Sequence, residues 1–298
     1  MIKLGCNAML PVAAELPQTP KDNPANWIDI EELVHFIHGL RLDIIDFQLF
    51  RGFRSTDPNY LRRLKILCQR CGLPIGFLGV GSGFVGVDSR ADGTTVGTAL
   101  DPDELRQRIA LVKKGIDLAA FTGAPLIRHF GGAIPPESEN RDDLWDTVVR
   151  SFQEVSDYAA GKGVLIGLHN HAPATAPTGD DILRLLRAVE RENFTYILDT
   201  GQWHGSPGAS ATGAVDPAVD FYEFMEQTAP HATYVRAKIY KIDSGREEWI
   251  DYERVMGILR KVNFNGNMSI VFEGKGNQCS DYEAIGLAAK FLRRLLTE

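Results

Sequence analysis

Short apolar segments alternate along this sequence with amphipathic segments of helical periodicity, eight of each, from residue 2 to residue 296. The apolar segments have the length and composition of buried β-strands, and they lie at residues 2–9, 42–50, 73–80, 124–132, 163–171, 194–202, 232–240 and 267–274. The amphipathic segments are predicted helices at residues 30–40, 58–72, 102–123, 143–163, 180–192, 217–229, 251–262 and 281–296. Regular alternation of strand and helix predicts parallel strand pairing with right-handed crossovers.

Eight strand–helix units in roughly 250–300 residues predict an α/β fold of one kind, the (β/α)8 TIM barrel. The chain has 298 residues and contains no low-complexity linker, so we expect a single domain over residues 1–298. The alternative is an open doubly wound sheet, but no G-x-G-x-x-G follows the first predicted strand. Three polar stretches rich in Gly or Pro, residues 15–24, 86–97 and 206–216, each follow a strand, and we expect them to be loops that cover or wall a site.

The charge balance excludes some classes of protein. The formal net charge is -7 and the pI is about 5.6, whereas proteins that bind nucleic acid usually carry a basic excess. No apolar run approaches the roughly 18 residues of a membrane span. The first ten residues, MIKLGCNAML, lack the long apolar core of a signal peptide. We therefore expect a cytoplasmic protein that binds neither nucleic acid nor membranes.

The predicted strands carry charged residues on one face near their carboxyl ends. In residues 233–240, TYVRAKIY, the apolar residues form the face that packs on helices, which leaves Arg236 and Lys238 facing into the barrel. The same alternation turns His169, Asp199 and Glu273 inward on the neighbouring strands. One such residue alone is usually part of a structural ion pair. Four consecutive strands with ionisable groups at the end where TIM-barrel active sites lie favour a catalytic site.

Other polar residues near the strand ends are candidate substrate contacts, namely Asn7, Arg128, His129, His171, Gln202, His204 and Lys275. On the fourth strand either Arg128 or His129 faces inward. A structural role stays open for all of them: His171 is equally suited to a structural hydrogen bond, and His204, beside Trp203, to loop packing.

At these residues the chain resembles the xylose-isomerase-like TIM barrels, the superfamily of sugar phosphate isomerases and epimerases. The resemblance is clearest in LAAFTGAPLIRHFGG, in LDTGQ, in YVRAKIY followed by EEWIDYERV, and in NGNMSIVFEG. It implies a divalent metal held by Glu, Asp, His and Glu on strands five to eight, and two glutamates that move a proton beside a sugar carbonyl. Asp199 and Glu273 match this pattern. His169 replaces the strand-five Glu, Arg236 replaces the strand-seven His, and the family's frequent D-x-G-H ends in Gln202.

The replacements leave two alternatives, because a guanidinium offers only donors and cannot ligate a metal. In the first, a divalent ion such as Mn²⁺ or Zn²⁺ stays on His169, Asp199 and Glu273, with water and substrate oxygens completing its coordination. In the second, no metal binds, and Arg236 and Lys238 stabilise the developing enediolate. We expect the first. In either case Glu273 is the predicted base and His169 the partner acid.

The predicted function is therefore that of a sugar or sugar-phosphate isomerase or epimerase, which transfers a proton α to a carbonyl. Two alternatives remain: a keto-sugar or cyclitol dehydratase or lyase, and a degenerate sugar-binding barrel without activity. The expected partner is a small carbohydrate, and the cations of strand seven favour an anionic one. The resemblance also suggests a homo-oligomer, such as a dimer.

Overall fold

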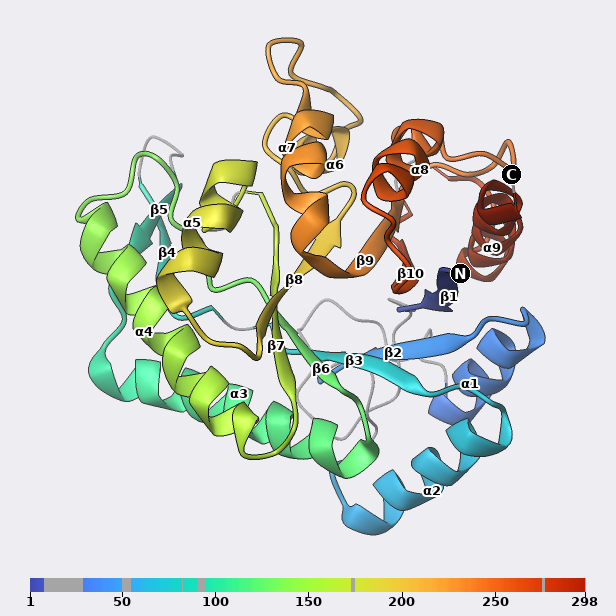
Figure 1. The fold of residues 1–298 in the computed structure, drawn as a ribbon, viewed down its shortest axis with the longest axis horizontal. Coiled ribbons are helices and arrows are strands. Elements are labelled where there is room, and N and C mark those ends of the chain that lie inside the picture. The colour runs from blue at the N-terminus through green and yellow to red at the C-terminus, as the bar shows by residue number, and fades with distance from the viewer. Residues whose placement is uncertain are drawn as a thin grey trace.

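Residues 1–7, 29–49, 55–81, 83–90, 95–172, 175–274 and 277–297 are described by the computed structural model of this chain. Parallel strands close into an eight-stranded barrel, surrounded by helices (Figure 1). In chain order its strands are β1 (Lys3–Cys6), β2 (Ile44–Gln48), β3 (Ile75–Gly79), β6 (Leu126–His129), β7 (Leu165–His169), β8 (Phe194–Asp199), β9 (Ala232–Ile239) and β10 (Asn267–Phe272). The barrel closes where β1 pairs with both β2 and β10. The predicted TIM barrel is confirmed.

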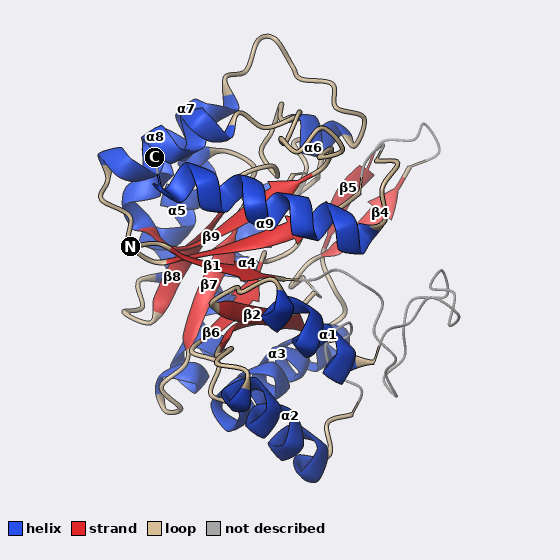
Figure 2. Ribbon diagram, turned by 90° about the vertical axis from the view of Figure 1, so that its right-hand side faces the viewer, coloured by secondary structure: helices blue, strands red, loops and turns tan. Residues whose placement is uncertain are grey.

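The helices that follow the strands form the outer layer, and Figure 2 shows them around the strands from the side. They are α1 (Ile30–Gly39), α2 (Pro58–Arg70), α3 (Pro102–Thr122), α4 (Arg141–Ala160), α5 (Gly179–Val189), α7 (Phe221–Thr228), α8 (Tyr252–Lys261) and α9 (Asp281–Thr297). Helix α7 begins four residues later than predicted, because the Asp220 carboxylate accepts a hydrogen bond from the Tyr222 amide and caps the helix there. No helix among the described residues is long and apolar enough to span a membrane.

Two of the predicted loops contain regular structure. Within residues 86–98, β4 (Gly86–Ser89) and β5 (Thr95–Thr98) form an antiparallel pair, so residues 86–97 are not an irregular loop as the sequence predicted. The Gly97 amide donates to Ser138 Oγ at 2.7 Å, which attaches this pair to the segment before α4. Residues 206–216 include the short helix α6 (Pro207–Ser210). The predicted loop at 15–24 lies outside the described residues.

The apolar core has two parts. The larger part lies between the strands and the helices, and it contains the outward-facing residues Val235, Ala237 and Ile239 of β9. The smaller part lies inside the barrel and consists of Phe77, Leu126, Ile197 and Tyr234. These four side chains form an apolar layer in the interior, and the ionisable residues of the same strands follow it toward their carboxyl ends.

Candidate active site

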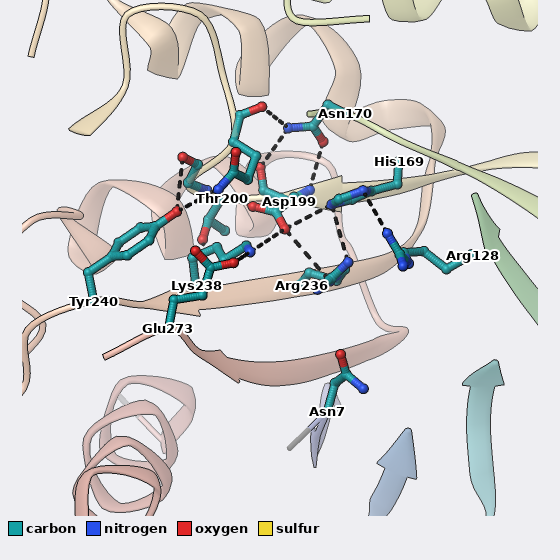
Figure 3. Close-up of polar contacts among 12 residues, drawn as sticks. Asn7, Arg128, His169, Asn170, Asp199, Thr200, Arg236, Lys238, Tyr240 and Glu273 are labelled. Atoms are coloured by element: carbon teal, nitrogen blue, oxygen red, sulfur yellow. Dashed lines mark hydrogen bonds and ion pairs between the residues drawn. The ribbon is translucent and has the colours of Figure 1, made fainter. Parts of the chain in front are cut away.

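Five ionisable side chains from consecutive strands meet at the carboxyl end of the barrel, as Figure 3 shows. They are His169 at the end of β7, Asp199 at the end of β8, Arg236 and Lys238 on β9, and Glu273 directly after β10. The first four are almost completely buried, with 0–2% of each residue exposed. The Glu273 side chain keeps 24% of its surface exposed. Glu273 is therefore the member of the group that a substrate can reach.

Asp199 lies at the centre of this group. Its Oδ2 atom is 2.9 Å from His169 Nε2, 3.6 Å from Arg236 Nε and 3.8 Å from Lys238 Nζ. Its Oδ1 atom accepts a hydrogen bond from the Gly201 amide at 3.0 Å. Both carboxylate oxygens are thus in use, and the buried negative charge is balanced by the cations of β9.

His169 is held as a neutral imidazole. Burial lowers its pKa well below the ordinary value, and the charges of Arg236 and Arg128 lower it further. Because Nε2 faces the Asp199 carboxylate and Nδ1 lies 3.5 Å from Arg128 Nη1, the ring carries its proton on Nε2 and accepts at Nδ1. A buried ring that is engaged at both nitrogens cannot readily give a proton to a substrate, so this geometry does not support the predicted role of partner acid.

Glu273 and Lys238 form the pair that faces the open end of the barrel. The Lys238 ammonium contacts the Glu273 carboxylate. Burial raises the pKa of Glu273, but the charge and the hydrogen bond of Lys238 outweigh this effect, so the pKa lies below its ordinary value. Glu273 is therefore an ionised carboxylate at neutral pH, as a general base must be.

Asn170 fixes the backbone of Asp199. Its amide nitrogen donates to the carbonyl oxygens of Asp199 and Gln202 at 3.0 and 3.2 Å, and its oxygen accepts from the Asp199 amide and the Tyr196 hydroxyl, each at 2.8 Å. The alternation that turns His169 inward turns Asn170 outward, and it is not among the predicted site residues. The sequence does contain a signal for Asn170: an amide side chain at the end of an otherwise apolar strand face is buried and needs hydrogen-bond partners.

Hydroxyl groups hold the backbone of Lys238 in a similar way. Thr200 Oγ1 accepts from the Lys238 amide at 3.0 Å, and the Tyr252 hydroxyl donates to the Lys238 carbonyl at 2.7 Å. The Tyr240 hydroxyl donates to the Gly201 carbonyl and accepts from Gln202 Nε2, both at 3.2 Å. Gln202 Oε1 is buried and has no hydrogen-bond partner in the part of the chain that the structure describes. Gln202 thus lies beside the group with an acceptor still free.

A sequence profile described as xylose isomerase-like TIM barrel matches residues 38–295. The chain belongs to this family. A search of curated proteins gives no significant match.

Solved structures similar to this member of the family include three sugar epimerases. A structure of L-ribulose 3-epimerase aligns with a TM-score of 0.71 at 16% identity, over 100% of this chain and 95% of that chain. D-psicose 3-epimerase from Clostridium cellulolyticum H10 with D-tagatose aligns at 0.72 and 15%, over 99% of both chains. 3-Keto-D-glucoside 4-epimerase from E. coli aligns at 0.67 and 15%, over 100% of both. At such identities these likenesses establish the fold.

The described residues do not form the metal site that the family resemblance predicts. No group of three or more His, Cys, Asp or Glu side chains in the described part of the chain is arranged to hold a metal ion. The Lys238 ammonium contacts Glu273 and lies 3.8 Å from Asp199, so a cation already lies between the two expected carboxylate ligands. His169 Nε2 faces Asp199. The Nη1 atom of Arg236 lies 3.4 Å from the same His169 nitrogen. A divalent cation at this position would be repelled by two fixed positive charges.

Arg128, His171 and Gln202 lie next to this group, whereas Asn7 is linked to it only through Gln48 and Arg128. Arg128, on β6, faces the barrel interior and approaches His169. Asn7 follows β1, is buried, and accepts a hydrogen bond from Gln48 Nε2 at 3.4 Å. The His171 ring centre lies 5.7 Å from that of His169. Burial, followed by the charge of Lys238, lowers the pKa of His171 to about 4, so this half-buried ring is neutral at pH 7.

Two further predicted contacts, His129 and His204, lie away from this group. The His129 ring lies 4.5 Å from the Phe84 ring and 5.5 Å from the Phe152 ring, in the layer between barrel and helices, because the alternation that turns Arg128 inward turns its neighbour outward. His204 is exposed. Together with Pro177 and Thr178 it lines a cavity of about 530 Å³ that contains none of the five ionisable residues. Lys275 lies outside the described residues.

Proposed function

We propose that this chain is a carbohydrate isomerase or epimerase that moves a proton on a carbon next to a carbonyl, with Glu273 as the base. The observation that carries the proposal is the contact between the Lys238 ammonium and the partly exposed Glu273 carboxylate at the carboxyl end of the barrel. The epimerases among the similar structures support a sugar as the substrate.

Glu273 removes the proton from the carbon α to the carbonyl, and the electron pair of the broken C–H bond moves to the carbonyl oxygen and gives an enediolate. Lys238 and Arg236 place positive charge beside Glu273 and Asp199, where it stabilises the developing oxyanion. Preorganised charge of this kind contributes about 10²–10³ in kcat for each donor. The base and the stabilising cations of this step are all side chains of this chain, and no step passes through a metal.

The return of the proton decides the product. If Glu273 returns it to the neighbouring carbon on the same face, and the hydroxyl proton of that carbon moves to the former carbonyl oxygen, the substrate is isomerised. Epimerisation needs a proton donor on the opposite face of the enediolate, and the His171 ring, which is neutral at pH 7, does not provide one. His169 and Asp199 are positioning residues in this proposal: they hold each other and the cations of β9 in place.

Exchange of solvent deuterium into ketoses tests the proposal. L-ribulose, D-allulose and D-tagatose are incubated with the protein in D2O, and deuterium at the α carbon is followed by NMR. We expect exchange with at least one of them, and a loss of about 10³-fold or more in E273Q, because an amide cannot accept the proton. E283Q, at an exposed position on α9, is the matched control and should keep the wild-type rate.

The other outcomes separate the alternatives. Tight sugar binding without exchange would indicate a binding protein, and the proposal would then be wrong. Exchange accompanied by loss of water, seen as a mass decrease in the product, would assign a dehydratase that shares the first step. Exchange that survives in E273Q would leave the base assignment without support.

A further inference from the structure

Arg128 is a buried cation without a carboxylate partner. Its guanidinium is only 5% exposed and points from β6 toward His169 (Figure 3). Nη1 lies 3.5 Å from His169 Nδ1, and Nη2 donates to Gln48 Oε1 at 3.2 Å. Both partners are neutral. Within the described residues no carboxylate oxygen lies within 4.0 Å of this guanidinium, and its Nε atom has no hydrogen-bond partner at all.

The neighbouring carboxylates are committed to other cations. Asp199 interacts with His169, Arg236 and Lys238, and Glu273 with Lys238. Two carboxylates therefore face three cations at this level of the barrel, counted over the described part of the chain.

A third carboxylate, Asp46, lies elsewhere in the interior. It accepts hydrogen bonds from the Tyr234 hydroxyl at 2.9 Å and from the Ser269 hydroxyl, and burial raises its pKa to about 7, so it carries little negative charge. Among the described residues no carboxylate contacts Arg128, and the negative charge that acts on it is that of Asp199, which is shared with His169, Arg236 and Lys238.

The guanidinium keeps its charge in spite of burial. Burial, followed by the charge of Arg236, lowers the pKa of Arg128 to about 9, which still leaves it protonated at neutral pH. An unpaired buried charge is strongly unfavourable, and it persists in a folded protein when a ligand or the chemistry of a site uses it.

The surroundings of Arg128 fit a planar anion. A Cβ atom at Gly79 would come within 3.0 Å of Nη2 and 3.1 Å of Nε, so the lack of a side chain there leaves room for this edge of the guanidinium. Nη2 donates to Gln48, which in turn donates to Asn7, so neutral amides flank the cation. Nε has no hydrogen-bond partner among the described residues, and Nε together with Nη2 is the edge through which a guanidinium binds a carboxylate in a bidentate manner.

We propose that Arg128 binds a carboxylate group of the substrate, so that the substrate is a keto-sugar acid rather than a neutral ketose. The inference rests on the proposed function only for the position of the reacting carbon, which lies beside Glu273. The single charge of Arg128 corresponds to one negative charge, and Arg236 and Lys238 already serve Asp199 and Glu273. A phosphate dianion would bring more negative charge than this cation balances.

Three ligands that differ only at C6 test the proposal: D-fructose, D-fructuronate and D-fructose 6-phosphate, with the matching D-tagatose series as a second stereochemistry. Dissociation constants are measured by calorimetry with the full-length protein. In at least one series we expect the uronate to bind tenfold or more tightly than the neutral ketose. This preference should fall by tenfold or more in R128M and R128Q, and R128K should keep part of it because the charge remains. R63Q, at an exposed position on α2, is the control and should keep the wild-type preference.

The results separate this proposal from the proposed function. If neither series shows a carboxylate preference that depends on Arg128, the carboxylate site is wrong, even where E273Q abolishes deuterium exchange. If the phosphate binds most tightly and loses this advantage in R128M, the anion is a phosphate and the assignment is overturned. If the uronate preference depends on Arg128 but no ligand exchanges deuterium, the anion site stands and the proposed catalysis fails. Circular dichroism of each variant excludes misfolding as the cause.

Discussion

The Lys238 ammonium contacts the Glu273 carboxylate across the paired strands β9 and β10, close to the carboxyl end of both. Burial alone would raise the pKa of Glu273, and it is the charge of Lys238 that brings the pKa below its ordinary value. The protonation state of the proposed base is therefore set by a residue on the neighbouring strand.

Replacing Lys238 by Met should move the acid limb of the pH profile of kcat/KM to higher pH. Glu273 is active when ionised, so activity is lost as the pH falls through its pKa, and this pKa rises when the ammonium is removed. The rate on the plateau should also fall by about 10²–10³-fold, because one charge beside the enediolate is lost. Deuterium exchange between about pH 4 and 9 measures both effects. An acid limb at the same pH in K238M and in the wild type would show that the limb does not report the ionisation of Glu273.

Divalent metals should not stabilise the wild-type protein. Lys238 lies between the two expected carboxylate ligands and Arg236 takes the place of the expected histidine. Addition of about 1 mM Mn²⁺ should leave Tm unchanged, whereas the double variant R236H/K238A removes both cations and adds an imidazole. With a Kd of about 10 µM, that variant would gain about 2.7 kcal/mol at this Mn²⁺ concentration, which thermal denaturation detects readily.

Metal analysis of the purified protein completes this experiment. A rise in Tm of the wild type with Mn²⁺, or a stoichiometric metal in the protein as isolated, would show that Lys238 and Arg236 move aside. The metal site expected from the sequence would then be correct after all.

Most of the barrel follows from the sequence because each strand–helix unit carries its own periodicity. The inward positions of Arg236 and Lys238 follow as well, since Val235, Ala237 and Ile239 can only face the helices. The antiparallel pair at residues 86–98 was missed, because its β4 strand is largely exposed and has no continuous apolar face.

The charge arrangement at the carboxyl end could be predicted only in outline. Alternation tells which side chains face inward, but the depth of each side chain depends on the stagger between strands. Lys238 pairs in register with Val271, two residues before Glu273, and its long side chain reaches forward to that carboxylate. Sequence spacing does not show this contact, so a metal site and an internal ion pair were equally compatible with the same residues.

Replacing Arg128 by Met should stabilise the ligand-free protein. The guanidinium is buried without a carboxylate, and a methionine of similar length removes the cost of its desolvation while the loss of the Gln48 hydrogen bond costs about 1 kcal/mol. We expect a net gain of about 1–2 kcal/mol, or a rise in Tm of about 2–6 °C. K238M is the matched control: it removes a paired cation and leaves the Glu273 carboxylate behind, so its Tm should fall. A fall in Tm of R128M similar to that of K238M would mean that the Arg128 charge is already compensated.

Asp46 should make the protein less stable as the pH rises from about 4 to 7. Its carboxylate lies inside the barrel, where burial raises the pKa to about 7 although Tyr234, Ser269 and the Phe77 amide donate to it. A raised pKa means that the folded state keeps a proton which the unfolded chain loses near pH 4, so stability is lost as the pH rises through this interval.

The magnitude follows from the difference between the two pKa values. It is on the order of 4 kcal/mol between pH 4 and 7, and the effect levels off above pH 7. Urea unfolding of the wild type and of D46N at several pH values isolates the contribution of Asp46 to the free energy of unfolding, because all other titrating groups are shared by the two proteins. The free energy of unfolding of the wild type relative to D46N should decrease over this interval. D142N, which changes an exposed aspartate on α4, is the surface control. A difference between wild type and D46N that is independent of pH would mean that Asp46 is ionised in the folded barrel, and a third carboxylate would then enter the charge balance of the interior.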